Sequence, residues 1–445
     1  MYSSALAVYL DRRMLTILLL GFASGLPLAL TGATMTVWLA ESGISKASIG
    51  VFLLAGLPYT LKFLWAPLID RGRLPWLTRR FGRRRGWLLA CQSALMLSLL
   101  LLTGENPATA PWSMGLTALL VAFCSASQDI VVDAYRVESL DRPQYGAGAA
   151  TYVLGYRFGM LASGAGALYL ASILSWPQVY AVMAGMVAIG MITVLSAPEP
   201  AAVDAGRMLA REHAEAATLV RHYGLTGRFA KLAAWLYGAV ISPFRDFVHK
   251  PDWWAVLLFI TLFKLGEVFA AALVLPFYLE LGFDKVEIAT VTKVFGLIAT
   301  IAGGLIGGGL VGRLGIMRGL LVTGVLQALS NFAYIALNAA GHDLGMLMVT
   351  VALENVCAGM ATAAFVAYLS SLCSLAYTAT QYALLTSLAK LASDLLKSSS
   401  GWFAEQLGWV SYFLLSIGLC LPALVLLLWL TTRPEQATAA AGKTD

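Results

Sequence analysis

Long apolar stretches recur along almost the whole 445-residue chain and constrain its fold more than any other feature. A membrane-spanning helix needs about 20 predominantly apolar residues. We expect twelve such spans, over residues 14–39, 48–68, 86–104, 112–136, 146–171, 177–197, 253–279, 287–311, 319–338, 344–370, 379–404 and 409–431. With 59% hydrophobic and 12% charged residues, the composition excludes an ordinary soluble domain. The sequence therefore predicts an all-α membrane protein.

A long hydrophilic connection divides the predicted spans six and six. We therefore expect an N-terminal six-helix bundle over residues 1–197, a cytoplasmic linker over 198–252, a C-terminal six-helix bundle over 253–431 and a tail over 432–445. Inside the linker, apolar residues recur at helical spacing between Phe229 and Val240, with Arg228 and Lys231 beside them. That pattern predicts an amphipathic helix on the cytoplasmic surface of the membrane.

Basic residues are unevenly distributed among the loops. The loops on one side carry most of them, at Arg12, Arg13, the cluster from Arg71 to Arg85, Arg142, Arg313 and Arg318. Loops on the other side, such as 104–111 and 172–176, contain no lysine or arginine. The positive-inside rule then places both termini in the cytoplasm. Because the arginine cluster accounts for much of the formal charge of +6, we expect membrane lipid and no nucleic acid as a partner.

Ionisable residues lie within or at the ends of the predicted spans, where a charge is costly and is usually kept for pairing or for function. They are Lys62, Asp129, Asp133, Arg136, Glu138, Arg157, Lys264, Glu267, Lys293, Glu354, Lys390, Asp394 and Lys397. Both signs are present, as a polar pathway for protons and a charged solute requires. This pattern predicts a transporter.

Other function classes lack their characteristic residues in this sequence. No Walker loop is present, so we do not expect ATP hydrolysis. The five cysteines are scattered without a C-x-x-C pair, which argues against disulfides and a metal site. The predicted spans contain no histidine, and no soluble catalytic domain is evident. We therefore expect neither an enzyme nor a cofactor.

Two short motifs carry a resemblance to the major facilitator superfamily. Asp70-Arg71 is followed by Gly82-Arg83-Arg84-Arg85 after the second predicted span, and a similar string from Gly308 to Arg318 follows the eighth. Both are similar to the cytoplasmic loop motif of that superfamily. The resemblance implies a fold of twelve transmembrane helices in two six-helix halves, which rock to open a central site to each side in turn.

Longer strings resemble a narrower family, the AmpG-type muropeptide permeases of bacteria. The strings are Gly21–Thr31, Lys62–Arg71, Gly82–Leu89, Ser125–Ala134, Gly146–Ala150, Val153–Arg157, Lys264–Gly266 and Glu354–Asn355. The resemblance implies proton-coupled import of anhydromuropeptides, GlcNAc-1,6-anhydro-MurNAc and its peptides, across the inner membrane for cell-wall recycling. It also implies a link to β-lactamase induction and antibiotic resistance. Glu267 replaces an expected aspartate, and the charged run from Lys390 to Lys397 is unusual, so the sugar-peptide preference stays open.

A substrate of this kind offers carboxylates, acetamides and sugar rings, which cations, polar groups and aromatic faces recognise. The cations expected to contact the carboxylates lie near the middle of their spans and are Arg157, Lys264 and Lys390. The polar and stacking contacts are expected from Gln128, Asn355, Tyr59, Tyr152 and Tyr156. For Lys264 the alternative is a simple ion pair with Glu267, three residues further along the same helix.

Proton coupling requires a group that changes charge inside the membrane. Since the four histidines lie in predicted loops, carboxylates must carry the proton. Asp129 lies deepest in its span and is the first candidate. Asp133, Glu267 and Glu354 are the others.

A gate at the cytoplasmic face is the alternative role for two of the acids. Asp133 and Glu138 lie near the cytoplasmic end of the fourth span, where they could pair with Arg71 or Arg83 beside Asp70. The substrate itself also has alternatives, because a major facilitator protein of this charge pattern could carry another organic anion, an acyl-coenzyme A or a drug.

Overall fold

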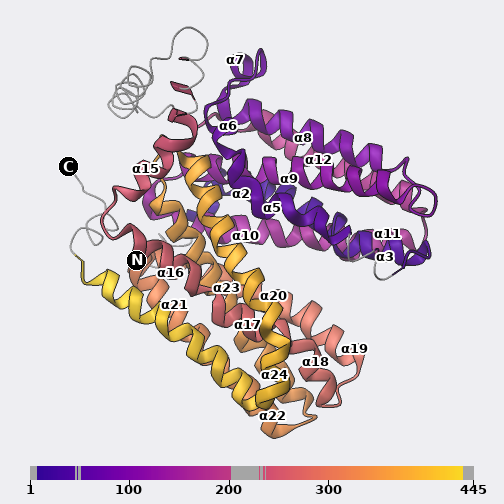
Figure 1. The fold of residues 1–445 in the computed structure, drawn as a ribbon, viewed down its shortest axis with the longest axis vertical. Helices are drawn as coiled ribbons and strands as arrows, with labels where there is room; N and C mark the ends of the chain where they lie inside the picture. The colour runs from indigo at the N-terminus through magenta and orange to yellow at the C-terminus, as the bar shows by residue number, and fades with distance from the viewer. Residues whose placement is uncertain are drawn as a thin grey trace.

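The computed structural model describes residues 8–45, 48, 52–201, 230, 234–235 and 237–433. Within these ranges the regular elements are helices, and they form two bundles (Figure 1). The predicted amphipathic helix over residues 228–240 is described only in part, at 230, 234–235 and 237–240, and these residues are helical. The tail after residue 433 lies outside the described residues.

The N-terminal bundle contains the elements up to residue 196. The first predicted span is α2 (Arg12–Leu30) and α3 (Ala33–Glu41), preceded by η1 (Val8–Leu10). The second is broken into η2 (Leu53–Gly56), α5 (Leu57–Leu61), η3 (Lys62–Leu64) and α6 (Ala66–Arg71). The remaining elements are α7 (Leu77–Phe81), α8 (Arg83–Leu102), α9 (Pro111–Ser139), η4 (Arg142–Gln144), α10 (Tyr145–Leu161), the π segment η5 (Ala162–Gly166), α11 (Ala167–Ala171) and α12 (Trp176–Ser196).

The C-terminal bundle follows a π segment, η6 (Tyr237–Ile241), and α15 (Ser242–Val248). The seventh span is interrupted twice, giving α16 (Trp253–Phe263), α17 (Leu265–Ala272) and α18 (Val274–Glu280). Next come α19 (Lys285–Ala289), the π segment η7 (Thr290–Phe295), α20 (Gly296–Leu314), α21 (Ile316–Ser330), α22 (Phe332–Ala340) and α23 (Leu344–Leu372). The last element is α24 (Thr378–Thr431), which Gly408 breaks in two with a positive φ of 71°.

Among the described residues, nine helical stretches are long and apolar enough to cross a membrane. The predicted spans 48–68, 146–171 and 379–404 are not counted among these nine. The first is broken into short helical pieces and the second contains η5, whereas the third is a regular part of α24 but carries three charged residues. The all-α membrane fold is confirmed, and the number of twelve spans stays a prediction.

Glycines bring α2 and α10 into backbone contact, as small residues do between membrane helices. A Cβ atom on Gly159 of α10 would lie 2.8 Å from the backbone nitrogen of Leu26, and one on Gly25 of α2 would lie 2.8 Å from the backbone carbonyl carbon of Tyr156. Neither position can accept a side chain without moving a helix. The contact fixes α10, and with it Tyr156 and Arg157, against the first span.

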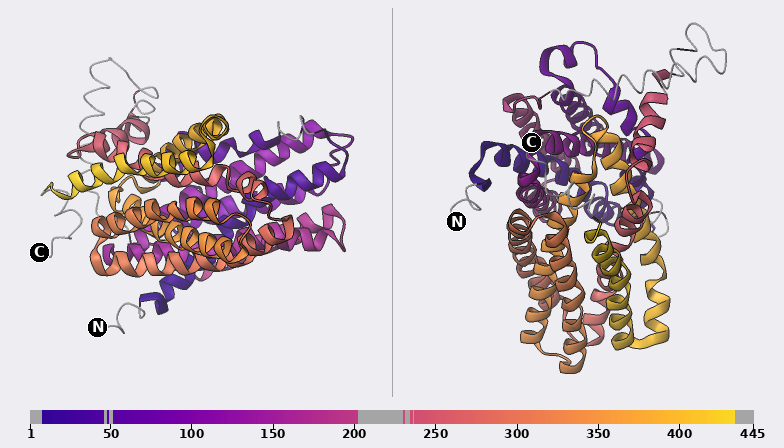
Figure 2. Two further views of the ribbon diagram at one scale, coloured as in Figure 1. Left: turned by 90° about the horizontal axis from the view of Figure 1, so that it is seen from below. Right: turned by 90° about the vertical axis from the view of Figure 1, so that its left-hand side faces the viewer.

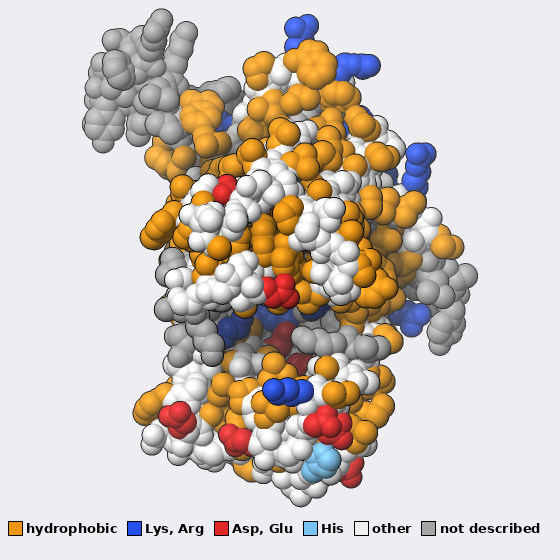
Figure 3. Space-filling model, turned by 90° about the vertical axis from the view of Figure 1, so that its right-hand side faces the viewer, with side chains coloured by type: hydrophobic (Ala, Val, Ile, Leu, Met, Phe, Trp, Pro, Cys, Tyr) orange, Lys and Arg blue, Asp and Glu red, His pale blue; other side chains and the backbone are white. Residues whose placement is uncertain are grey.

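The two bundles meet at one end of the molecule and separate at the other (Figure 1). We call these the closed end and the open end. One core cluster at the closed end combines Met14 and Val137 of the N-terminal bundle with Phe259 and Tyr368 of the C-terminal bundle. The start of α2 and the end of α24 lie at this end (Figure 2). Figure 3 faces the open end, where charged side chains of both signs lie in a furrow between the bundles.

Candidate functional site

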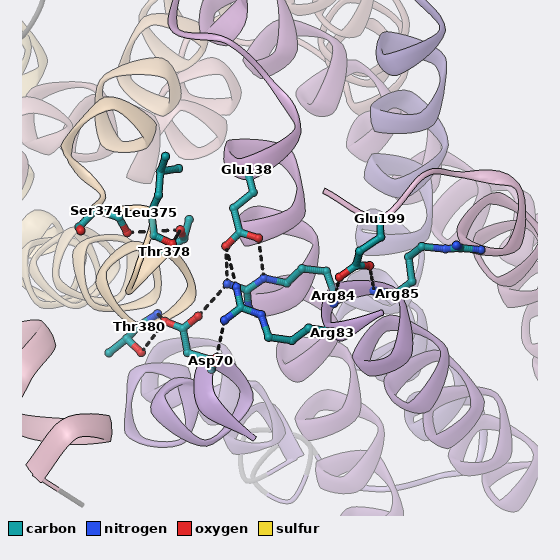
Figure 4. A network of polar contacts seen from close by, with 10 residues as sticks. All are labelled: Asp70, Arg83, Arg84, Arg85, Glu138, Glu199, Ser374, Leu375, Thr378 and Thr380. Carbon is teal, nitrogen blue, oxygen red and sulfur yellow. Dashed lines mark hydrogen bonds and ion pairs between the residues drawn. The ribbon is translucent and has the colours of Figure 1, made fainter. Parts of the chain in front are cut away.

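Arg84 is the centre of an ion-pair network at the closed end (Figure 4). It is the second residue of α8 and its side chain is only 1% exposed. Its Nη2 donates to Asp70 Oδ1 at 2.7 Å and to Glu138 Oε1 at 2.5 Å, and its Nε donates to Glu138 Oε2 at 2.9 Å. Arg83 contributes a longer contact to Glu138, at 3.4 Å. The network therefore joins the ends of α6, α8 and α9.

The start of α8 is held by an acid from beyond α12. Glu199 accepts hydrogen bonds from the backbone N–H groups of Arg84 at 2.8 Å and Arg85 at 3.0 Å. These are among the unpaired donors of a helix N-terminus, where a negative charge is favourable. Gly82 precedes the helix with a φ of 94°, and a Cβ atom there would lie 2.6 Å from Cγ of Glu199. The glycine thus leaves room for the acid that orients Arg84.

Asp70 carries the network across to the other bundle. Its Oδ2 accepts from both the backbone N–H and the hydroxyl of Thr380, each at 3.1 Å. Thr380 is the third residue of α24, so its N–H has no partner within the helix. The carboxylate is 3% exposed and is bound by Arg84 on one side and by this helix start on the other. The contact holds the two bundles together at the closed end.

Arg136 makes a second connection between the bundles, deeper in the molecule. It is 1% exposed, and it donates to the Ser370 hydroxyl at 2.9 Å and to the Tyr382 hydroxyl at 2.8 Å, both in the C-terminal bundle. Its Nη2 also lies 3.4 Å from Asp133 Oδ1. The other oxygen of Asp133 lies 3.6 Å from Nζ of Lys62. Asp133 is thus shared between two cations.

The prediction for the partners of Asp133 is wrong. Sequence position suggested Arg71 or Arg83, but Asp133 faces inward from α9 and pairs with Lys62 and Arg136. The prediction for Glu138 is confirmed for Arg83, although Arg84 makes the shorter bonds. The guanidinium carbon of Arg71 lies 5.8 Å from the centre of the Tyr377 ring, just before α24. Five residues separate the two acids on α9, so their side chains point about 140° apart around the helix axis, and this places them in different clusters.

Lys264 lies at the first interruption of the seventh span. It follows α16 and precedes α17, with φ −92° and ψ −5°. Its Nζ lies 2.6 Å from Oε2 of Glu267 and donates to the Thr362 hydroxyl of α23 at 2.8 Å. Glu267 lies in the first turn of α17, where the helix dipole favours an acid. The predicted pairing of Lys264 with Glu267 is confirmed, and irregular backbone at this depth is typical of a span that lines a cavity.

Charges from both bundles converge on Glu354 of α23. Arg157 of α10, Lys264 and Glu267 are all near enough to interact with it electrostatically. Within the described part of the chain, Glu354 makes no ion pair or hydrogen bond of its own. Arg157 likewise has no ion-pair partner among the described residues. These two half-buried groups thus come one from each bundle.

Asp129 lies one turn before Asp133 on α9 and is 7% exposed. It interacts electrostatically with Lys62, Asp133 and the tyrosines Tyr59, Tyr152 and Tyr156. In the described residues it forms no ion pair within 4 Å, and its Oδ1 has no hydrogen-bond partner. Asp129 differs in this respect from Asp133, whose two oxygens both face cations.

Three of the predicted polar contacts are directed at the protein itself. Gln128 is fully buried and donates to the backbone oxygen of Ala23, so it joins α9 to α2 and does not face a solute in this conformation. Asn355 accepts from Thr300 at 2.7 Å and so joins α23 to α20. Tyr59 is 9% exposed and packs with the buried alanines of α9. By contrast, Tyr152 and Tyr156 are half-buried, with ring centres 6.0 Å apart.

The predicted contact residue Lys390 is exposed on α24. Its Nζ lies 3.0 Å from Asp394, and Lys397 lies 3.9 Å from the same carboxylate. The three share one helix face with Ala379 and Ala383, which pack in a core cluster with Ile130 of the N-terminal bundle. That face therefore turns toward the N-terminal bundle. The charged part of this face, from Lys390 to Lys397, lies beyond that contact, toward the open end of the molecule.

Several residues of these polar networks were not singled out from the sequence as site residues. They are Lys62, Arg84, Arg136, Glu199, Thr362, Ser370, Thr380 and Tyr382. Lys62 and Arg136 carried a detectable signal, since both are cations inside apolar spans. The hydroxyl residues carried none, because serine, threonine and tyrosine are common in membrane helices.

The two helical bundles, with charged groups between them and a closed contact at one end only, define a membrane transporter. The family model of the Major Facilitator Superfamily matches residues 17–395. The anhydromuropeptide permease of Escherichia coli is 41% identical over 430 residues, which are 96% of this chain and 82% of the permease. The transporter AmpG 4 of Rickettsia conorii is 38% identical over 96% of this chain and 98% of its own. The chain therefore belongs to the Major Facilitator Superfamily and, within it, to the AmpG family.

Solved structures with the same fold are more distant in sequence. The proton:xylose symporter XylE, bound to 6-bromo-6-deoxy-D-glucose, gives a TM-score of 0.65 with 12% identity over 96% of each chain. A bacterial homologue of the iron transporter ferroportin in an outward-facing state gives 0.64 with 13% identity, covering 95% of this chain and 100% of that one. At these identities the likeness shows the fold alone.

Proposed function

We propose that this protein is a proton-coupled importer of anhydromuropeptides in the bacterial inner membrane and that it works by alternating access. The main support for this substrate is the 41% identity to the anhydromuropeptide permease across nearly the whole chain. The aligned region covers 82% of that relative and 98% of the Rickettsia one.

The closed end is proposed to face the cytoplasm, with both termini on that side. In support, the arginine-rich segment around α7 lies at this end, and positive loops are retained on the cytoplasmic side. In this orientation the open furrow faces the outside of the membrane. The conformation then corresponds to the state that accepts a substrate released from the cell wall.

The charges in the furrow fit the acidic part of such a substrate. Arg157 and Lys264 are cations from opposite bundles, and both act on Glu354. A stem-peptide carboxylate between them would receive charge-assisted hydrogen bonds. Tyr152 and Tyr156 offer aromatic faces beside Arg157 for the sugar rings. Since the two cations belong to different bundles, a bound carboxylate would also favour closure of the furrow.

Asp129 and Glu354 are the proposed proton carriers. Each is an acid within a span, and in the described residues neither forms an ion pair within 4 Å. A carboxylate with no fixed cation partner can lose and regain its proton without breaking a salt bridge. Asp133 and Glu267 are less suited, because each is already paired with a lysine.

Counterflow in proteoliposomes tests the substrate. Vesicles loaded with unlabelled GlcNAc-1,6-anhydro-MurNAc tetrapeptide should accumulate the labelled compound transiently without a proton gradient, because a carrier exchanges its substrate. Exchange of an acyl-coenzyme A or an unrelated organic anion, with none of the muropeptide, would overturn the assignment and favour those alternatives.

The same vesicles test the coupling. Asp129→Asn should abolish accumulation driven by an imposed proton gradient while counterflow continues, since the amide binds the same neighbours but carries no proton. Gln128→Asn, at the adjacent buried residue, is a matched control that should retain both activities if it folds. Gradient-driven accumulation at the normal rate in Asp129→Asn would exclude it as the carrier.

A further inference from the structure

A cavity of 940 Å³ lies on the flank of the closed end, outside the charged clusters between the bundles. Its walls come from both bundles, with η1, α2 and α10 on one side and α20 on the other. Most of its lining is apolar, including Leu15, Leu18, Leu154, Ile306 and Leu310. Leu15 is 56% and Ile306 54% exposed, so the cavity opens toward the lipid-facing surface.

The cavity lies at a direct contact between the bundles. The Tyr9 hydroxyl donates to the backbone oxygen of Leu305 at 3.1 Å and so joins η1 to α20. Burial raises the pKa of Tyr9 to about 12, which keeps this hydroxyl a donor at neutral pH. Beside it, a Cβ atom on Gly308 would lie 2.7 Å from the backbone oxygen of Gly146. Because each bundle supplies one wall, parting of the bundles at the closed end would open the cavity.

Three charged residues line the cavity, and their balance is positive. Arg12 begins α2, and Arg313 is the last residue but one of α20, so each bundle contributes one arginine. Within the described residues, Arg12 makes no ion pair. The third residue, Asp11, already accepts from the backbone N–H of Arg13 at 2.9 Å and from Gln144 at 3.4 Å. An anion at this rim would therefore face Arg12, Arg313, which also has a contact of its own within the protein, and Asp11, which already accepts two hydrogen bonds.

We propose that this cavity binds one anionic phospholipid of the cytoplasmic leaflet and that the lipid stabilises the closed state of this end. The phosphate would lie toward Arg12 and Arg313, and an acyl chain would cover the apolar wall. Basic pockets between membrane helices on the cytoplasmic side are suited to such headgroups. A ligand that needs walls from both bundles binds the closed state better and so shifts the population toward it. The inference uses the proposed orientation but not the proposed substrate.

Lipid retention measured by native mass spectrometry tests the site. The full chain is placed in mixtures of phosphatidylethanolamine and phosphatidylglycerol, and retained phosphatidylglycerol is counted. Each arginine is worth about 1 kcal/mol toward an anionic headgroup, or about fivefold in affinity. Arg12→Gln with Arg313→Gln should therefore weaken retention by about 25-fold. The matched control replaces Arg79 and Arg318, which are exposed arginines outside the cavity, and should retain the lipid.

The lysine variant Arg12→Lys with Arg313→Lys keeps the charge and should retain most of the binding, which separates a charge effect from misfolding. Spin-label distances across the closed end should report a larger closed fraction with phosphatidylglycerol than without it. Equal retention in the glutamine pair and in the control pair would overturn the proposal. Full competition by soluble glycerol phosphate would also overturn it, because the apolar wall would then contribute nothing. None of these readouts depends on transport, so they stay informative if the proposed substrate is wrong.

Discussion

Each bundle holds a lysine that directly follows a helix in a broken span and pairs with a carboxylate, but the two pairs have different connections. Lys62 follows α5 and lies 3.6 Å from Asp133, which also contacts Arg136 and through it the opposite bundle. Lys264 follows α16 and lies 2.6 Å from Glu267, and the charges around this pair are Glu354 and Arg157 in the furrow.

The difference assigns separate roles to two pairs of the same chemistry. The N-terminal pair belongs to a buried chain of contacts that ends on hydroxyl groups of the other bundle, so we propose that its charges serve closure. The C-terminal pair is 14% and 19% exposed and has no such connection in the described residues. We therefore propose that its charges serve substrate binding. A carrier needs both, because substrate binding must influence which end is closed.

The largest effect is expected at Arg136, because this residue alone links the Lys62–Asp133 pair to the opposite bundle among the described contacts. Arg136→Gln removes the bonds to Ser370 and Tyr382 and leaves Asp133 with Lys62 alone. Removal of one partner from a buried ion pair costs about 3–5 kcal/mol. The closed end should open or the protein should lose stability. Spin labels at the exposed positions 80 and 318, on opposite bundles, would report a longer distance.

Lys264→Gln is the matched control, since it removes the cation of the other pair. It should leave the distance between positions 80 and 318 unchanged. If Lys264→Gln opens the closed end while Arg136→Gln does not, the two roles are reversed.

The sequence predicted the positions of the charges but only some of their partners. Apolar stretches located each ionisable residue within a span, because a charge is conspicuous there. The sequence could not show which of the arginines at positions 83, 84 and 85 points inward. That depends on the rotation of α8 about its axis, which Gly82 and Glu199 set. Nor could it show that Asp133 and Glu138 belong to different clusters, because partners more than 50 residues away decide this.

A second prediction sharpens the binding role. Lys264→Gln should weaken binding of the peptide-bearing muropeptide about 10- to 100-fold, in keeping with the roughly 1.5–3 kcal/mol of a hydrogen bond to a charged group. The peptide-free disaccharide lacks the carboxylates and should lose far less. Isothermal titration calorimetry on the purified protein gives both values. Lys62→Gln is the control. It should change the affinity for the peptide-bearing muropeptide by less than about threefold, which corresponds to about 0.7 kcal/mol. Equal losses for both ligands would indicate that Lys264 is structural.

The smallest effect is expected on the exposed charged face of α24. Lys390 and Asp394 form an i,i+4 pair with 45% and 43% of their side chains exposed, and such pairs contribute about 0–1 kcal/mol. Lys390→Gln should therefore leave stability nearly unchanged. It should slow uptake of the anionic substrate by only a few-fold at low salt, since Lys390 adds to the positive potential at the entrance of the furrow. At 1 M salt, where the Debye length is about 3 Å, the difference should vanish.

Lys285→Gln, at an exposed lysine on α19 outside this face, is the control and should show no effect at either salt concentration. A loss above tenfold that persists at high salt would instead place Lys390 in direct contact with the substrate, and the open end would then bind as well as admit it.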